Sequence, residues 1–128
     1  MCFFSRWFIC FLALCLSAAP IRAAEIAELE RVFATCTGRL TAQLQDESLW
    51  DTPQTDQLRK SHAAMEELLL AVANPENGRA RLTLRVEARL AHARLLRAAR
   101  FSKDPRQAQW AQRRAAHLIN DCVSMLMS

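Results

Sequence analysis

Apolar side chains recur along most of this chain at the three- and four-residue spacing of an α-helix. Four such stripes follow one another, separated by short polar stretches. Their members are Ile26, Leu29, Phe33, Cys36, Leu40 and Leu44; Leu58, His62, Met65, Leu69 and Val72; Leu82, Val86, Leu90, Ala93 and Leu96; and Ala111, Ala115, Leu118, Cys122 and Met125. Because residues at this spacing share one helix face, each stripe predicts a helix that buries that face in a core.

Three prolines indicate where helices begin. Each follows a residue whose side chain can cap a helix N-terminus: Thr52-Pro53, Asn74-Pro75 and Asp104-Pro105. The boundaries predict helices near residues 25–46, 53–73, 76–101 and 105–127. Since connections this short favour antiparallel neighbours, we expect an all-α, up-down-up-down four-helix bundle. The chain has 128 residues and only two glycines, which argues against a β-sandwich or barrel.

The N-terminal segment has the pattern of a secretory signal peptide. A short start containing Arg6 precedes an apolar run over residues 8–19, and small residues follow before the chain turns acidic. The run is shorter than the roughly 20 residues needed to cross a bilayer. We expect cleavage after Ala23, with cleavage after Ala19 as an alternative.

Cleavage there would leave a mature helical domain over residues 24–128, exported to the periplasm. Two less favoured interpretations are an uncleaved membrane anchor over residues 1–23 and a lipoprotein attached through Cys15, where the bulky Leu14 stands in place of a small residue. No other run resembles a transmembrane helix.

The cysteine count agrees with export. Three of the five cysteines belong to the leader, which leaves Cys36 and Cys122. A single pair in an oxidising compartment favours a disulfide over two separate buried thiols. Both residues lie on apolar stripes, of the first and last helices, and these helices are antiparallel neighbours in the expected bundle. The bridge would therefore tie the two ends of the domain together.

Charge is divided between the halves of the chain. Residues 24–76 carry 10 acidic and 4 basic side chains, whereas residues 77–128 carry 3 acidic and 11 basic ones. In one interpretation the acidic half compensates the basic half in ordinary ion pairs; folding about Pro75, for example, sets Glu66 level with Arg85.

In the other interpretation, the arginines of the third and fourth helices present a basic face to lipid headgroups, lipopolysaccharide or an acidic protein. That face would comprise Arg81, Arg85, Arg89, Arg94, Arg97, Arg100, Arg106, Arg113 and Arg114. Nucleic acid is not an expected partner, because the chain carries an export signal and no nucleic-acid recognition motif.

Candidate chemistry is sparse. No pattern typical of a catalytic site, a haem attachment site or a structural metal site occurs, so we expect neither catalysis nor a cofactor. The one ligand-like cluster, with soft donors suited to cuprous copper, is His117, Cys122, Met125 and Met127. A disulfide at Cys122 would remove its thiolate. We expect His62 in the core or at its boundary, and Trp50 closing the bundle end between the first two helices.

Several short segments resemble a family of small exported helical proteins of proteobacteria with a paired cysteine and no assigned function. These segments are Cys36-Thr-Gly-Arg-Leu40, Arg85-Val-Glu87-Ala, His92-Ala-Arg-Leu-Leu96 and the C-terminal Cys122. The resemblance implies export and a helical fold. The sequence therefore predicts a non-enzymatic periplasmic binding or accessory protein, with an anionic-surface binder as the alternative and copper binding a distant third.

Overall fold

The computed structural model describes residues 19–50 and 52–127, with side chains from residue 23 onward. The described residues form four α-helices, two short 3₁₀ turns and no β-strand, which confirms the all-α four-helix fold. The elements are α2 (Ala19–Ser48), α3 (Thr55–Val72), η1 (Pro75–Asn77), α4 (Gly78–Phe101), α5 (Pro105–Ser124) and η2 (Met125–Met127). Most of the predicted leader, residues 1–18, lies outside the described residues. None of the described helices is long and apolar enough to cross a membrane.

Helix boundaries follow the predicted capping signals at two of the three prolines. The side chains of Asn74 and Asp104 accept hydrogen bonds from backbone N–H groups of the turns that they precede, η1 and α5. The third boundary differs: α3 begins at Thr55, not at residue 53. The hydroxyl of Thr52 donates instead to Glu47 at 2.8 Å and so ties the turn back to α2.

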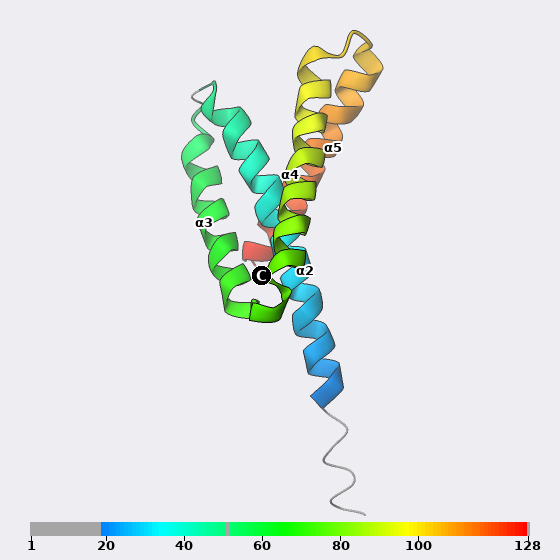
Figure 1. The fold of residues 1–128 in the computed structure, drawn as a ribbon. Helices are drawn as coiled ribbons and strands as arrows, with labels where there is room; N and C mark the ends of the chain where they lie inside the picture. Colours follow the sequence, from blue (N-terminus) through cyan, green and yellow to red (C-terminus); the bar gives the residue numbers. More distant parts are fainter. Residues whose placement is uncertain (1–18, 51, 128) are drawn as a thin grey trace, which may run out of the picture.

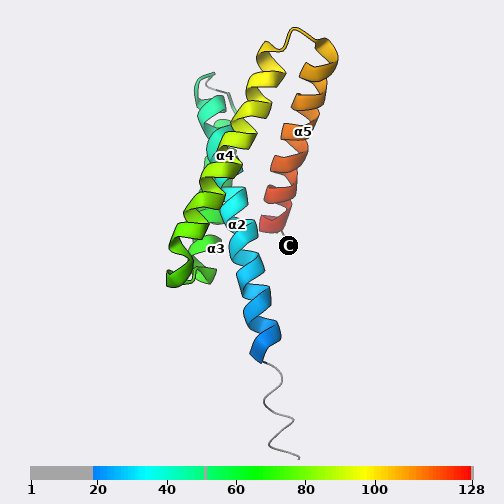
Figure 2. The ribbon, with the colours of Figure 1, turned by 45° about the vertical axis from the view of Figure 1, so that its right-hand side comes forward.

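The first helix begins earlier than predicted, at Ala19 instead of residue 25. Pro20 lies in its first turn, where proline is tolerated. In Figures 1 and 2 the N-terminal turns of α2 extend beyond the other helices. Ile26 and Leu29 of the predicted core stripe are accordingly exposed, so that stripe becomes buried only from Phe33 onward.

The helices form two antiparallel hairpins, α2–α3 and α4–α5, which diverge toward their connecting turns (Figure 1). Helix α2 is central: it packs against the other three helices, and most extensively against α4. The sequence predicted antiparallel neighbours for this helix, whereas its largest interface in the structure is with α4. The core lies where the hairpins cross and includes Phe33, Leu40, Met65 and Leu69.

Gly38 explains why α2 and α4 pack so closely. A Cβ atom at this position would lie 2.3 Å from the backbone oxygen of Arg85 and 3.1 Å from the Cβ of Ala88. Only the absence of a side chain lets the two backbones touch, because real Cβ atoms essentially never approach a carbonyl oxygen that closely.

This contact also decides which face of α4 is buried. The inward residue is His92, whereas Leu82, Val86 and Leu90 of the predicted core stripe are exposed, as is Ala93. The prediction for this helix was therefore wrong by about a third of a turn of the helix. Its apolar stripe faces away from α2.

The predicted disulfide is present. Cys36 of α2 and Cys122 of α5 are bonded, with their Cα atoms 5.5 Å apart, and both residues are buried in the core. Since α2 and α5 share a much smaller interface than α2 and α4, the bond supplies much of what holds α5 to the central helix.

Replacing Gly38 with alanine should destabilise the protein by about 1–3 kcal/mol, because the new methyl group would force α2 and α4 apart. Gly78 is the matched control: it starts α4 in a helical conformation, and an added Cβ would meet nothing closer than 3.9 Å. Gly78→Ala should raise the free energy of unfolding by about 0.5–1 kcal/mol. Urea unfolding of the two variants measures both changes; equal effects would contradict the close approach.

Removing the disulfide with Cys36→Ala and Cys122→Ala together should lower the free energy of unfolding by about 4–5 kcal/mol in the loop-closure model, because the bond closes a long loop. The residues are 86 positions apart. Dithiothreitol should lower the urea midpoint of the wild type and leave that of the double variant unchanged. A wild type insensitive to the reductant would show that the bond contributes nothing.

Candidate functional site

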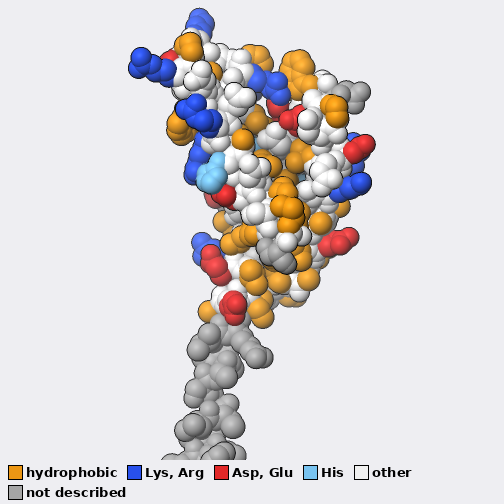
Figure 3. Space-filling model, turned by 180° about the vertical axis from the view of Figure 1, so that it is seen from behind, with side chains coloured by type: hydrophobic (Ala, Val, Ile, Leu, Met, Phe, Trp, Pro, Cys, Tyr) orange, Lys and Arg blue, Asp and Glu red, His pale blue; other side chains and the backbone are white. Residues whose placement is uncertain are grey.

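A cleft of about 670 Å³ opens between the two hairpins, on the side of α2 that lies between α3 and α5. Figure 3 shows it as a hollow with apolar side chains inside. Its volume lies within the roughly 300–1,000 Å³ typical of small-ligand sites. Along the helix axes its walls run from Gln54 to Ser61 on α3 and from Gln112 to Val123 on α5. The cleft is therefore about 10–16 Å long.

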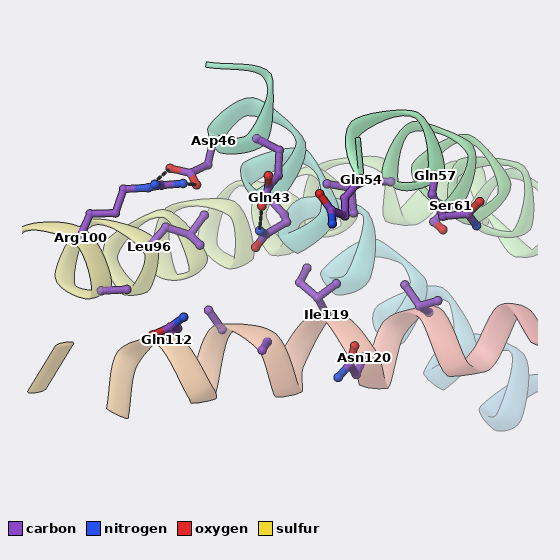
Figure 4. Close-up of a pocket in the computed structure, with 16 residues that line it drawn as sticks. Gln43, Asp46, Gln54, Gln57, Ser61, Leu96, Arg100, Gln112, Ile119 and Asn120 are labelled. Atoms are coloured by element: carbon purple, nitrogen blue, oxygen red, sulfur yellow. Dashed lines mark hydrogen bonds and ion pairs between the residues drawn. The ribbon is translucent and has the colours of Figure 1, made fainter. Parts of the chain in front are cut away.

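The walls of the cleft carry both apolar side chains and carboxamides. Leu58, Ile119 and Val123 contribute apolar surface, and Ile119 points into the opening in Figure 4. Five of the ten carboxamide side chains in the sequence line the cleft: Gln43, Gln54, Gln57, Gln112 and Asn120. A carboxamide both donates and accepts hydrogen bonds and carries no charge.

Four of these carboxamides have free hydrogen-bonding capacity. Gln54 at the N-terminal cap of α3, Gln57 on α3, and Gln112 and Asn120 on α5 make no side-chain hydrogen bond with any described residue. Only Gln43, at the back of the cleft, is engaged. Sequence analysis missed this set, because its members come from separate helices that the fold brings to opposite walls.

Charged side chains of α2 and α4 line one end of the cleft. Arg100 of α4 donates two hydrogen bonds to the Asp46 carboxylate of α2, the one from Nε measuring 3.1 Å (Figure 4). The hydrogen bond to Asp46 raises the pKa of Arg100. The same guanidinium lies over Trp50, 4.8 Å from the ring centre.

The prediction that Trp50 closes the bundle end was wrong, because the residue is 58% exposed. It stacks on an arginine of the other hairpin instead of packing between α2 and α3.

Three of the nine predicted basic-face arginines pair with the acidic half of the chain. Arg85 meets Glu66 at 3.1 Å, as folding about Pro75 predicts. Arg100 pairs with Asp46, and Arg81 meets the buried carboxylate of Glu30 at 2.5 Å.

Glu30 is stabilised as a carboxylate despite its burial. The hydrogen bond from Asn77 contributes most to lowering the pKa of Glu30, with Arg81 and the backbone of Asn74 also contributing, against the opposing effect of burial. Glu30 thus anchors the turn between α3 and α4 to α2.

The other six arginines form no ion pair within the described part of the chain and are exposed: Arg89, Arg94, Arg97, Arg106, Arg113 and Arg114. Lys and Arg side chains gather on the α4–α5 side of the molecule in Figure 3. Compensation by the acidic half therefore accounts for one third of the predicted face and leaves two thirds open to solvent.

The C-terminal residues considered for copper are not assembled into a site. Cys122 is in the disulfide, and His117 Nδ1 faces Asp121 at 3.5 Å on the exposed side of α5. Among residues 19–50 and 52–127, no group of three or more His, Cys, Asp or Glu side chains is placed to hold a metal ion. His62 is half-buried between α2 and α3, with Nε2 2.9 Å from the Thr41 hydroxyl.

Comparison with protein-family models, with curated proteins and with solved structures finds no match to this chain.

His92 lies directly behind the cleft and is 1% exposed. Gln43 donates to Glu47 at 3.0 Å, which turns its carbonyl oxygen toward His92 Nε2 at 2.9 Å. Nε2 therefore carries the proton and donates a hydrogen bond to the Gln43 carbonyl oxygen. The other ring nitrogen, Nδ1, is the only buried side-chain polar atom in the described residues without a hydrogen-bond partner.

The surroundings of His92 keep the ring neutral. Burial, with a smaller effect from the nearby charge of Arg39 and against that of Asp46, lowers the pKa of His92 to about 4. A second proton would place an N–H at Nδ1 with no acceptor. The neutral His92 ring thus holds the Gln43 side chain, one of the carboxamides of the cleft, in a fixed orientation.

We expect stability to fall in mild acid because of His92. The folded-state pKa lies below the ordinary value near 6.5, so the unfolded chain binds the proton first. Between pH 6.5 and pH 4 the free energy of unfolding of the wild type should fall by about 3 kcal/mol more than that of His92→Gln, since one pKa unit corresponds to about 1.4 kcal/mol. Urea unfolding across this range tests it. The exposed-site control His117→Gln should follow the wild type; a His92→Gln profile parallel to the wild type would disprove the assignment.

Proposed function

We propose that this protein is an exported, non-enzymatic binding protein that takes an uncharged ligand into the cleft between its two hairpins. The leader pattern and the single cysteine pair support export. The observation that carries the binding function is the set of four carboxamides without intramolecular partners, which line the same cleft as apolar side chains of α3 and α5. Such walls suit a ligand with an apolar body and neutral hydrogen-bonding groups.

The charges around the cleft argue against an anionic ligand. Its one cation, Arg100, is engaged by Asp46, and the Glu47 carboxylate accepts hydrogen bonds from Gln43 and Thr52. No unpaired cation of the lining is left for an anionic ligand. A hydroxyl- or amide-bearing ligand meets partners at Gln54, Gln57, Gln112 and Asn120 without the cost of desolvating a charge.

Filling the cleft should abolish binding without disturbing the fold. Ala116 lines the cleft and is exposed, so Ala116→Phe places a ring in the opening. The uncharged dye Nile red should bind the wild type with enhanced fluorescence and bind Ala116→Phe at least tenfold more weakly. Ala63→Phe, at an exposed position of α3 outside the lining, is the matched control. Equal binding by wild type and Ala116→Phe, or equal loss in both variants, would refute the cleft as the site.

A second function, binding to an anionic surface of the cell envelope, is favoured by a different observation. Six exposed arginines on α4 and α5 have no ion-pair partner in the described structure, so intramolecular compensation does not explain them. The planar guanidinium suits phosphate and carboxylate groups. Retention on anionic vesicles that weakens as salt rises is the property that this function requires.

A further inference from the structure

The outward face of α4 carries a row of apolar side chains that no other described helix covers. Leu82, Val86, Leu90 and Phe101 are 61%, 45%, 51% and 73% exposed, respectively. At 100° per residue they fall within an arc of about 100°, on the side of the helix away from His92. Single exposed leucines are ordinary on protein surfaces, but four large apolar side chains along one helix face indicate an interaction surface.

The same face is strongly cationic. Helix α4 contains seven arginines and one acidic residue, Glu87. The three arginines paired with acids of α2 and α3 leave four without an ion pair: Arg79, Arg89, Arg94 and Arg97. All four are exposed.

Helical geometry places these cations around the apolar row. Arg79 and Arg97 fall within the arc of the row, and Arg89 and Arg94 lie on its two flanks. The apolar positions are thus bordered by positive charge on both sides. This is the pattern of a helix that lies in the interface of an anionic membrane, with apolar side chains inserted and arginines at the phosphates.

We propose that α4 docks by this face, lying flat on the surface of an anionic lipid bilayer. The proposal rests on the anionic-surface function and names the element and residues that perform it. Charge complementarity selects the partner: the four unpaired cations favour a surface dense in phosphate. The row from Leu82 to Phe101 spans about 28 Å of the helix within one arc of its outward surface, which suits a helix lying along a surface. Apolar insertion and cationic attraction together supply the two signals that stable membrane association requires.

The test is co-sedimentation with vesicles of phosphatidylglycerol and phosphatidylcholine in equal parts, with pure phosphatidylcholine for comparison. The full chain is used as cells process it, with the N-terminus determined by mass spectrometry and all variants in the same form. We expect binding to the anionic vesicles that weakens as salt rises, and much weaker binding to the zwitterionic ones.

Two variants separate the apolar and cationic parts of the face. Leu90→Glu removes an inserted side chain and adds a repelled charge, and should weaken binding at least tenfold. Arg94→Gln with Arg97→Gln should weaken it about thirty-fold, since each cation near such a surface contributes about 1 kcal/mol.

Matched controls lie off this face. Leu70 on α3 is 75% exposed, so Leu70→Glu makes the same change elsewhere. Arg31→Gln with Lys60→Gln removes two exposed cations, one of α2 and one of α3, that form no ion pair in the described structure. Both controls should change binding less than twofold.

The possible failures are distinguishable. If the wild type does not bind anionic vesicles, the anionic-surface function falls and the α4 proposal with it. If the wild type binds but the α4 variants bind equally well, or the control variants lose the binding, the function stands and the α4 proposal is overturned. If the protein binds soluble polyglutamate as tightly as it binds the anionic vesicles, and Leu90→Glu does not weaken this binding, the cations serve an acidic protein partner. That result would also overturn the α4 proposal.

Discussion

The close approach of α2 and α4 at Gly38 is the constraint on which the arrangement of this protein depends. With no side chain at this position, the backbone of α2 lies against that of α4 near Arg85 and Ala88. Polar contacts follow along the same interface on either side of Gly38, from Glu30 with Arg81, through Gln43 with His92, to Asp46 with Arg100. The inward face of α4 therefore carries polar side chains as well as Leu84, which packs against the core.

Both proposed surfaces follow from this packing. Because α4 lies against α2, the helices α3 and α5 pack on other sides of α2 and leave the cleft open between them. Because α4 turns the face with His92 and Leu84 toward the core, its apolar row and its unpaired arginines face outward. The Cys36–Cys122 bond secures the remaining helix to the central one from within the core.

Much of the fold could be predicted from the sequence, because its signals are local. The caps at Asn74 and Asp104, the four helical stripes and the parity of the cysteines indicate the helices and the disulfide. The Glu66–Arg85 pair could be predicted because folding the chain about Pro75 sets these two residues level on neighbouring helices. Which side of α4 is buried could not be predicted in the same way. This helix has two apolar arcs, one through Leu82 and Leu90 and one through Leu84 and Leu95. Periodicity alone does not choose between them.

The feature that does choose, the missing side chain of Gly38, lies on another helix, and its partner is known only once the helices are placed. The same holds for the cleft, whose carboxamides are distant in the sequence. Exposed aromatic residues such as Trp50 also depend on tertiary contacts, here with Arg100.

The most direct test of the account is a nuclear Overhauser measurement on the folded protein. The account predicts a cross-peak between the Gly38 α-protons and the Ala88 methyl group, and none between the Leu90 methyl groups and side chains of α2, α3 or α5. Cross-peaks from Leu90 to core residues such as Leu40 or Met65, with none from Gly38 to Ala88, would contradict it.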